Sequence, residues 1–252
     1  MPEKSKIYFV SDVHLGALML KNKREHEIRF ANWLDFISND VSELYLLGDI
    51  FDFWYEYKNV VPKGFTRILG KIANLTDRGI AVHFFTGNHD AWVYDYLPFE
   101  TGVILHRHEY ITDILGKKFF LAHGDEHDVS YKGYHLVKKI FLNKTLQWFY
   151  SCLHPNFAFH LAYKWSKSSR LARNEIEEEF KIKNEGMYKF AECYLSKDCI
   201  DYFIFGHRHR MANEKIGSSS NFVLLGDWIK YNSYGVFDGN NFELKIFSES
   251  IL

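Results

Sequence analysis

The feature that most constrains the fold is a series of six short apolar runs. They cover residues 7–10, 44–47, 82–85, 119–122, 202–205 and 222–225. Each run is apolar at both alternating positions, which is typical of strands that are buried on both faces. Apolar residues at helical spacing separate the first three runs, at 28–37 and 65–72. This alternation of strand and helix predicts a layered α/β fold.

Five of these runs end in polar residues with metal-binding side chains. Asp12 and His14 follow the first, Asp49 the second, Asn88, His89 and Asp90 the third, His123 the fourth, and His207 and His209 the fifth. In open α/β sheets the ligand crevice lies outside the carboxyl ends of the strands. We therefore expect these side chains to converge on one site.

The candidate ligands are two carboxylates, one amide and four imidazoles. They are Asp12, His14, Asp49, Asn88, His123, His207 and His209. Such nitrogen and oxygen donors suit Mn, Fe, Zn or Co, and the set is too rich in histidine for Mg or Ca. Each short motif alone is more often a turn than a metal site. Five of them in order, each at the end of an apolar run, make coincidence a poor explanation.

With its Asp-x-His, Gly-Asp, Gly-Asn-His-Asp, His and Gly-His-x-His motifs, the chain resembles the calcineurin-like metallophosphoesterases. The resemblance runs from Asp12 to Asp227 and covers most of the sequence. It implies a four-layer α-β-β-α sandwich, and we expect residues 1–252 to form one domain. Residues 130–197 lack strand runs and place apolar residues at helical spacing, so we expect a helical insert there. The resemblance also implies an enzyme with two divalent ions, for which we expect manganese, with iron or zinc as alternatives.

The resemblance further implies how the ligands are shared. One ion would be bound by Asp12, His14, Asp49 and His209, and the other by Asp49, Asn88, His123 and His207. Two ions that share a water lower its pKa, so that a bridging hydroxide attacks the phosphorus at neutral pH. We expect catalytic roles for Asp49, for His89 and for Asp90, whose carboxylate would hold the tautomer of His89 while the ring assists the leaving oxygen. The alternative for His89 is a turn residue that only packs.

Within this family the chain is similar to the UDP-2,3-diacylglucosamine pyrophosphohydrolases of lipid A synthesis. The similarity lies in the aromatic residues after Asp49, in the block from His123 to Asp128 and Tyr131, and in residues 224–228. It implies cleavage of the substrate pyrophosphate to UMP and 2,3-diacylglucosamine 1-phosphate (lipid X). One position departs from the pattern, because the best-known members carry Arg where this chain has His89.

The insert has a composition of its own. Residues 129–174 contain eight Lys or Arg and no Asp or Glu, in a chain whose net charge is −1, and they are interleaved with aromatic residues. A helical surface of this kind suits anionic headgroups, or acyl chains beside a pyrophosphate. The substrate contacts expected there and at the metal centre are Asn88, His89, Asp128, Tyr131, Lys167 and Arg170. The alternative is a cationic cap whose aromatic residues are buried as ordinary filler.

Other partners and the compartment follow from charge and cysteine usage. Single-stranded nucleic acid is disfavoured because the rest of the surface is acidic and would repel a long polyanion. Cys152, Cys193 and Cys199 form no C-x-x-C pair, and the first residues show no secretion signal. We expect a cytoplasmic protein with a lipid-nucleotide substrate, peripheral on an anionic inner-membrane surface, with no nucleic acid and no obligate protein partner.

Two competing functions remain open. The chain could be a phosphodiesterase or phosphomonoesterase acting on soluble nucleotides, which would have no use for a basic aromatic insert. It could also be a protein-interaction scaffold that has lost its metals, although the complete ligand set argues against this.

The C-terminal segment predicts one more element. Residues 231–252 alternate apolar and polar side chains around a turn at 238–241. We expect a terminal hairpin that completes the second sheet.

Overall fold

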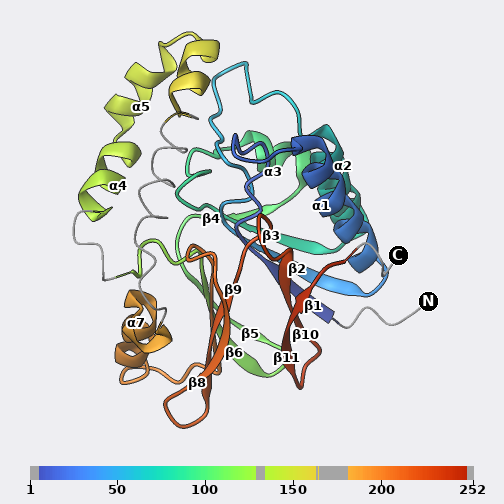
Figure 1. The fold of residues 1–252 in the computed structure, drawn as a ribbon, viewed down its shortest axis with the longest axis vertical. Coiled ribbons are helices and arrows are strands. Elements are labelled where there is room, and N and C mark those ends of the chain that lie inside the picture. Colours follow the sequence, from blue (N-terminus) through green and yellow to red (C-terminus); the bar gives the residue numbers. More distant parts are fainter. Residues whose placement is uncertain (1–5, 129–133, 163, 165–180, 249–252) are drawn as a thin grey trace.

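The computed structural model describes residues 6–128, 134–162, 164 and 181–248. Within them two sheets pack face to face, with helices on both outer faces (Figure 1). The four-layer α/β sandwich expected from the sequence is confirmed.

The first sheet has six strands in the order β11-β10-β1-β2-β3-β4. They are β1 (Lys6–Val10), β2 (Val41–Leu47), β3 (Ala81–Phe85), β4 (Ile104–His106), β10 (Ser233–Phe237) and β11 (Phe242–Ile246). The strands from β1 to β4 are parallel, so their carboxyl ends lie at the same edge.

The second sheet has five strands in the order β5-β6-β7-β9-β8. They are β5 (Tyr110–Ile114), β6 (Lys117–Ala122), β7 (Tyr202–Phe205), β8 (Met211–Ile216) and β9 (Ser220–Leu225). Its central strands β6, β7 and β9 are parallel, while β5 and β8 pair antiparallel at the edges. All six apolar runs of the sequence are therefore strands.

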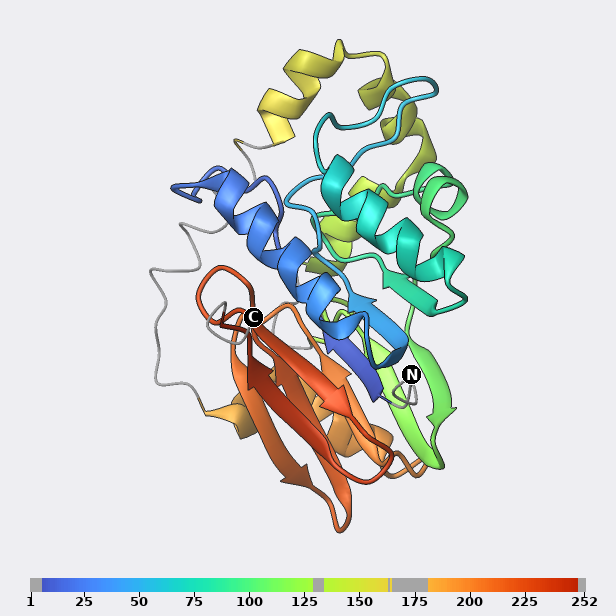
Figure 2. The same ribbon diagram turned by 90° about the vertical axis from the view of Figure 1, so that its right-hand side faces the viewer.

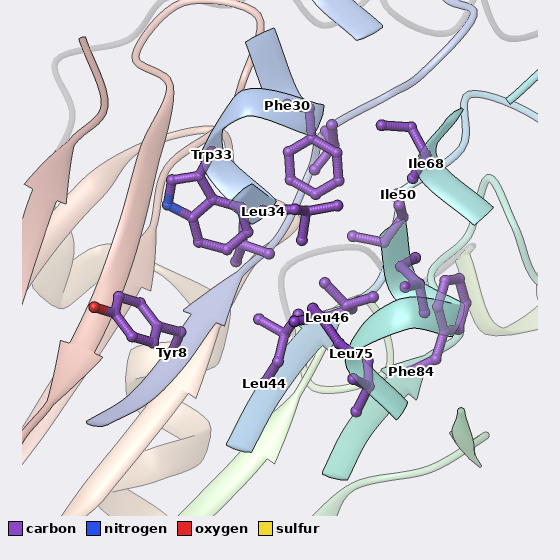
Figure 3. Packing of buried hydrophobic residues seen from close by; sticks show 14 of the residues in the cluster. Tyr8, Phe30, Trp33, Leu34, Leu44, Leu46, Ile50, Ile68, Leu75 and Phe84 are labelled. Atoms are coloured by element: carbon purple, nitrogen blue, oxygen red, sulfur yellow. The ribbon is translucent and has the colours of Figure 1, made fainter. Parts of the chain in front are cut away.

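Three buried apolar clusters separate the four layers. The first lies between the six-stranded sheet and α1 (Lys23–Ile37), α2 (Thr66–Asp77) and α3 (Tyr96–Thr101), where Trp33 and Phe30 pack over strand residues (Figure 3). Helices α1 and α2 lie side by side over this sheet (Figure 2). The second cluster fills the space between the sheets, with Phe9 stacked on Phe119 at 5.8 Å between ring centroids. The third joins the five-stranded sheet to α7 (Gly186–Tyr194).

The terminal hairpin forms, but in the other sheet from the one expected. Strand β10 pairs antiparallel with β1, so β10 and β11 extend the first sheet. The expectation that the hairpin completes the second sheet was wrong. Alternation of apolar residues predicts a strand with one buried face, but it carries no information about which distant strand will be its neighbour.

The described part of the insert is helical. It contains α4 (Tyr134–Leu142), α5 (Lys144–Ser151), the short 3₁₀ helix η1 (Ile182–Asn184) and α7. Figure 1 shows α4 and α5 outside the two sheets, whereas α7 lies against the second sheet. Among the described residues, every helix is too short or too polar to cross a bilayer.

Candidate metal centre

The predicted ligands come together from both sheets. Asp12 and His14 follow β1, Asp49 follows β2 and Asn88 follows β3, all in the first sheet. From the second sheet, His123 follows β6, and His207 and His209 follow β7. Because parallel strands present their carboxyl ends at one edge, two facing sheets deliver these seven side chains to a common point.

The first ligand group is centred on Asp12. Its Oδ1 lies 3.6 Å from Nε2 of His14 and 3.4 Å from Nε2 of His209. The two Nε2 atoms are 3.3 Å apart. Asp49 joins this group, with its Oδ2 3.8 Å from Nε2 of His14.

The second ligand group is centred on His123. Its Nε2 lies 3.4 Å from Oδ2 of Asp49 and 3.4 Å from Oδ1 of Asn88. The ring of His207 lies beside it, with 5.2 Å between centroids and an angle of 75°. The same Asp49 oxygen therefore faces both groups, as a carboxylate shared by two ions must.

These separations fit donors arranged around cations. Metal–ligand bonds of about 2.0–2.2 Å put two donors on one ion about 3 to 3.5 Å apart. Oδ1 of Asp12 is buried and accepts no hydrogen bond from the described residues, although two imidazole nitrogens face it. A buried carboxylate oxygen without a donor is costly unless a cation compensates it. The donors present therefore fit divalent metal ions.

Three of the candidate histidines also have a partner at Nδ1, the ring nitrogen that points away from the centre. Nδ1 of His209 donates to Oδ2 of Asp227 at 3.0 Å, and Nδ1 of His123 donates to the Leu47 carbonyl at 2.9 Å. Nδ1 of His14 lies 3.4 Å from Oδ1 of Asp52. Such partners fix the tautomer that leaves Nε2 free to bind a metal.

Asp52 and Asp227 have roles that the sequence analysis did not assign. Both lie in motifs that carried the resemblance, the aromatic segment after Asp49 and residues 224–228. A second acidic residue three positions after Asp49 was the available signal for Asp52. Neither carboxylate could be matched to its histidine without the fold, because Asp52 is 38 and Asp227 is 18 positions from its partner.

The backbone at the centre is unusual. Eight described residues other than glycine have positive φ, and five of them are predicted ligands: Asp12, His14, Asp49, His207 and His209. This left-handed conformation is costly for such residues and is concentrated at functional sites. The glycines of the motifs leave room for it. A Cβ on Gly87 would collide with the Asp49 carboxylate, and one on Gly206 would lie 2.6 Å from Oδ2 of Asp12.

The Asp90 carboxylate binds this backbone and does not bind the ring of His89. Its carboxylate accepts from the N–H groups of Gly87 at 2.7 Å and Ile50 at 2.8 Å, with longer bonds from Asp49 and Phe51. The expected pairing of Asp90 with His89 was therefore wrong. Adjacent residues on a tight turn point to different sides, and Asp90 turns inward. Burial and the charge of Asp49 raise the pKa of Asp90 to about 7, against the effect of the N–H groups.

His89 faces the metal centre. Its Nδ1 donates to the Asp52 carbonyl at 3.0 Å, which fixes the tautomer by a main-chain group. Its Nε2 lies 4.0 Å from Oδ2 of Asp49, and its side chain is 11% exposed. The ring also meets His14 edge to face, with 4.8 Å between centroids.

The field of the site favours positive charge. Burial alone would raise the pKa of the Asp49 carboxyl, yet His123 and His89 hold it well below its usual value. Burial alone would lower the pKa of His123, but the charge of Asp49 raises it to about 10. A position where an imidazole is driven to carry a proton is one that suits a metal cation.

The residues predicted to contact substrate lie in different places. Asn88 and His89 lie at the centre. Tyr131, Lys167 and Arg170 lie outside the described residues. Asp128 has a side chain only 2% exposed, with Oδ2 3.6 Å from NH1 of Arg208, so it faces a protein cation.

The insert rests on the loops that follow the metal-binding strands. The hydroxyl of Tyr55 donates to the Gln147 carbonyl at 3.0 Å, and Nε1 of Trp92 donates to the Phe141 carbonyl at 3.0 Å. Tyr150 packs on both rings, at centroid distances of 4.9 Å. The inner face of the insert is thus an aromatic layer packed on the loops that follow β2 and β3.

The outer face of the insert leaves large apolar side chains in solvent. Trp148 is 61% and Phe149 is 58% exposed. In the described part of this segment the other exposed large apolar residues are Ile140, Leu142, Leu146, Phe157 and Leu161. Filler residues of a closed cap would be buried, so a cap that only packs on its own core does not account for this face.

Comparison with known proteins agrees with this geometry. Residues 5–211 match the family model described as calcineurin-like phosphoesterase. The "UDP-2,3-diacylglucosamine hydrolase" of Porphyromonas gingivalis is 40% identical, over 96% of this chain and 97% of that protein. Proteins of the same name are 26% identical in Photobacterium profundum, over 96% of this chain and 97% of that protein, and 28% identical in Neisseria meningitidis, over 90% of each.

Proposed function

Because the chain belongs to the calcineurin-like phosphoesterases, and among them to the UDP-2,3-diacylglucosamine hydrolases, we propose that it cleaves the pyrophosphate of UDP-2,3-diacylglucosamine. The products are UMP and 2,3-diacylglucosamine 1-phosphate. The chain is a hydrolase, and its family works with divalent metals. The observation that carries the proposal is the convergence of the ligands on the shared Asp49, combined with an exposed apolar insert.

We propose two ions, with manganese as the first choice and iron or zinc as alternatives. Asp12, His14, Asp49 and His209 hold one, and Asp49, Asn88, His123 and His207 hold the other. All seven are nitrogen or oxygen donors of the kind these metals accept. When bound, such ions supply Lewis acidity, activate water at neutral pH and orient the phosphoryl oxygens.

The protein groups around the ions have separate tasks. His89 directs Nε2 to the centre while Nδ1–H donates to the Asp52 carbonyl, so this ring, when it is protonated on both nitrogens, is in position to donate the Nε2 proton to the leaving oxygen. Asp90 holds the Asp49 segment through main-chain N–H groups and so keeps the shared carboxylate in place. We therefore assign Asp90 to positioning and His89 to catalysis.

The insert at residues 130–197, within a single domain of 1–252, receives the lipid part of the substrate. Its aromatic inner layer packs on the loops that also carry Asp49 and Asn88, which suits acyl chains carried on a sugar whose pyrophosphate lies at the metals. Tyr131, Lys167 and Arg170 remain proposed contacts to the phosphate or uridine side. Asp128 we assign to Arg208 instead.

The outer face of the insert lies on an anionic membrane surface at the cytoplasmic side of the inner membrane. Exposed Trp148, Phe149 and Phe157 supply apolar contact, and Lys139 and Lys144 supply charge, on a segment with no acidic residue from 129 to 174. A peripheral position would bring the enzyme to a lipid substrate that does not leave the bilayer.

The test compares substrates. Metal-loaded protein is offered UDP-2,3-diacylglucosamine, cyclic AMP and a nitrophenyl phosphodiester. Release of UMP from the lipid nucleotide, with a kcat/KM at least about 10²-fold above the other two, supports the proposal. Comparable rates on the soluble esters would favour the alternative, a phosphodiesterase or phosphomonoesterase of soluble nucleotides.

A further inference from the structure

Arg208 occupies an unusual place in the sequence. It lies between the proposed ligands His207 and His209, in the loop after β7. Both neighbours have positive φ, 65° and 51°. Because a left-handed backbone is held only by its surroundings, the contacts of Arg208 bear on how those rings are held.

The guanidinium of Arg208 faces two carboxylates. Its Nε lies 2.6 Å from Oε2 of Glu185, and its NH2 donates to Oε1 of Glu185 at 3.0 Å. Its NH1 lies 3.6 Å from Oδ2 of Asp128. The two carboxylates are nearly buried, with side chains 9% and 2% exposed, so solvent screens these pairs only weakly.

One of the two carboxylates precedes the insert, and the other precedes its last helix. Asp128 is the last described residue before the insert begins. Glu185 follows η1 and immediately precedes α7, where the chain returns to the second sheet. One side chain in the loop after β7 therefore contacts both the residue where the insert begins and the residue before its last helix.

We propose that Arg208 is a positioning residue that couples the insert to the loop after β7, which we call the metal loop. Its planar guanidinium binds carboxylates through several nitrogens at once, whereas a lysine has only one nitrogen to offer. When metal binding orders the metal loop, Arg208 then also orders Asp128 and Glu185. Ordering the insert stabilises the metal loop by the same free energy, because coupling between two sites is reciprocal. The effect on substrate rests on the proposed function, whereas the coupling itself does not.

Hydrogen exchange measures the coupling directly in the full chain. In the unaltered protein, loading with Mn²⁺ should slow exchange in α4, α5 and α7. In Arg208→Lys and in Glu185→Gln this metal-dependent slowing should shrink, while the exposed control Arg24→Lys keeps it. The double variant should lose little more than either single one, because both remove the same link.

Kinetics supply the second readout. Arg208→Lys should raise KM for the lipid nucleotide about fivefold to tenfold and leave kcat within about twofold, with metal content unchanged. A side chain that only stabilises α7 would speed exchange equally with and without metal, and that result would overturn the proposal. So would metal-dependent slowing of normal size in both variants. Failure to hydrolyse the lipid nucleotide would overturn the proposed function alone, since the exchange result stands without it.

Discussion

The Nε2 atoms of His14 and His209 lie 3.3 Å apart, although the two residues are 195 positions apart in the chain. Their rings are stacked, with 4.9 Å between centroids and an angle of 11°. Two nitrogens this close, both facing Oδ1 of Asp12, repel each other unless they share a proton or a cation. The close approach of the two rings is therefore explained by metal binding as well as by folding.

Substitution of His89 is expected to affect catalysis without affecting metal binding. We expect His89→Ala to retain both metals and to lose about 10²-fold or more in kcat, because the ring acts on the leaving oxygen rather than as one of the seven ligands. Metal analysis and turnover are measured on the same preparation. A variant that lost metal in proportion to activity would make His89 a ligand and contradict its assignment.

The hydrogen bond from His209 to Asp227 is expected to support metal binding. Asp227→Asn should weaken metal affinity about 10- to 100-fold, because Nδ1 of His209 loses its anionic acceptor. The matched control is Asp77→Asn, an exposed aspartate at the end of α2. Competition against a chelator gives the affinities, and equal values for the two variants would remove Asp227 from the centre.

The proposed membrane contact of the insert can be tested by a substitution on its exposed face. Trp148→Glu should reduce binding to vesicles that contain phosphatidylglycerol, because it removes apolar contact and adds repulsion. Phe99→Glu is the control, since Phe99 is 86% exposed but lies on α3. Co-sedimentation measures binding. The proposed surface is wrong if both substitutions have the same effect.

His83 and His106 make stability depend on pH away from the centre. Nδ1 of His83 lies 2.8 Å from Nε2 of His106, and burial lowers the pKa of each to about 4. The unfolded chain takes up protons near its ordinary pKa of about 6.5, so this stabilising contribution is complete above that pH and is lost as the pH falls towards 4.

We expect the unaltered protein to lose about 1 kcal/mol more than His83→Phe between pH 7.5 and pH 5, a value reduced for the partial exposure of His83. Urea unfolding at the two pH values measures this difference. Parallel losses in the two proteins would show that folding does not lower the pKa of His83.

Much of the fold and the ligand set could be predicted because both are local properties of the sequence. A run such as 202–205 is apolar at every position, and the polar residues after it, including His207 and His209, must lie at the end of the strand. Parallel strand order then brings such ends together.

What could not be predicted depends on contacts between distant residues. The hairpin joined β1 instead of the second sheet, Asp90 turned to the backbone of residues 49–51, and Asp52 took the place beside His14 and His89. Each outcome is a choice among several carboxylates or strand edges of similar local character. Only the packed structure decides between them.

The central claim is that a metal centre organised by Asp49 cleaves the pyrophosphate of UDP-2,3-diacylglucosamine. The most direct measurement is UMP release by Mn²⁺-loaded protein, by the same protein after chelator treatment, and by Asp49→Ala, each with its metal content determined. We predict UMP release only from the loaded, unaltered protein, with its recovery when Mn²⁺ is restored, and joint loss of metal and turnover in Asp49→Ala. Full metal-dependent activity in Asp49→Ala, or UMP release that persists after the chelator, would contradict the account.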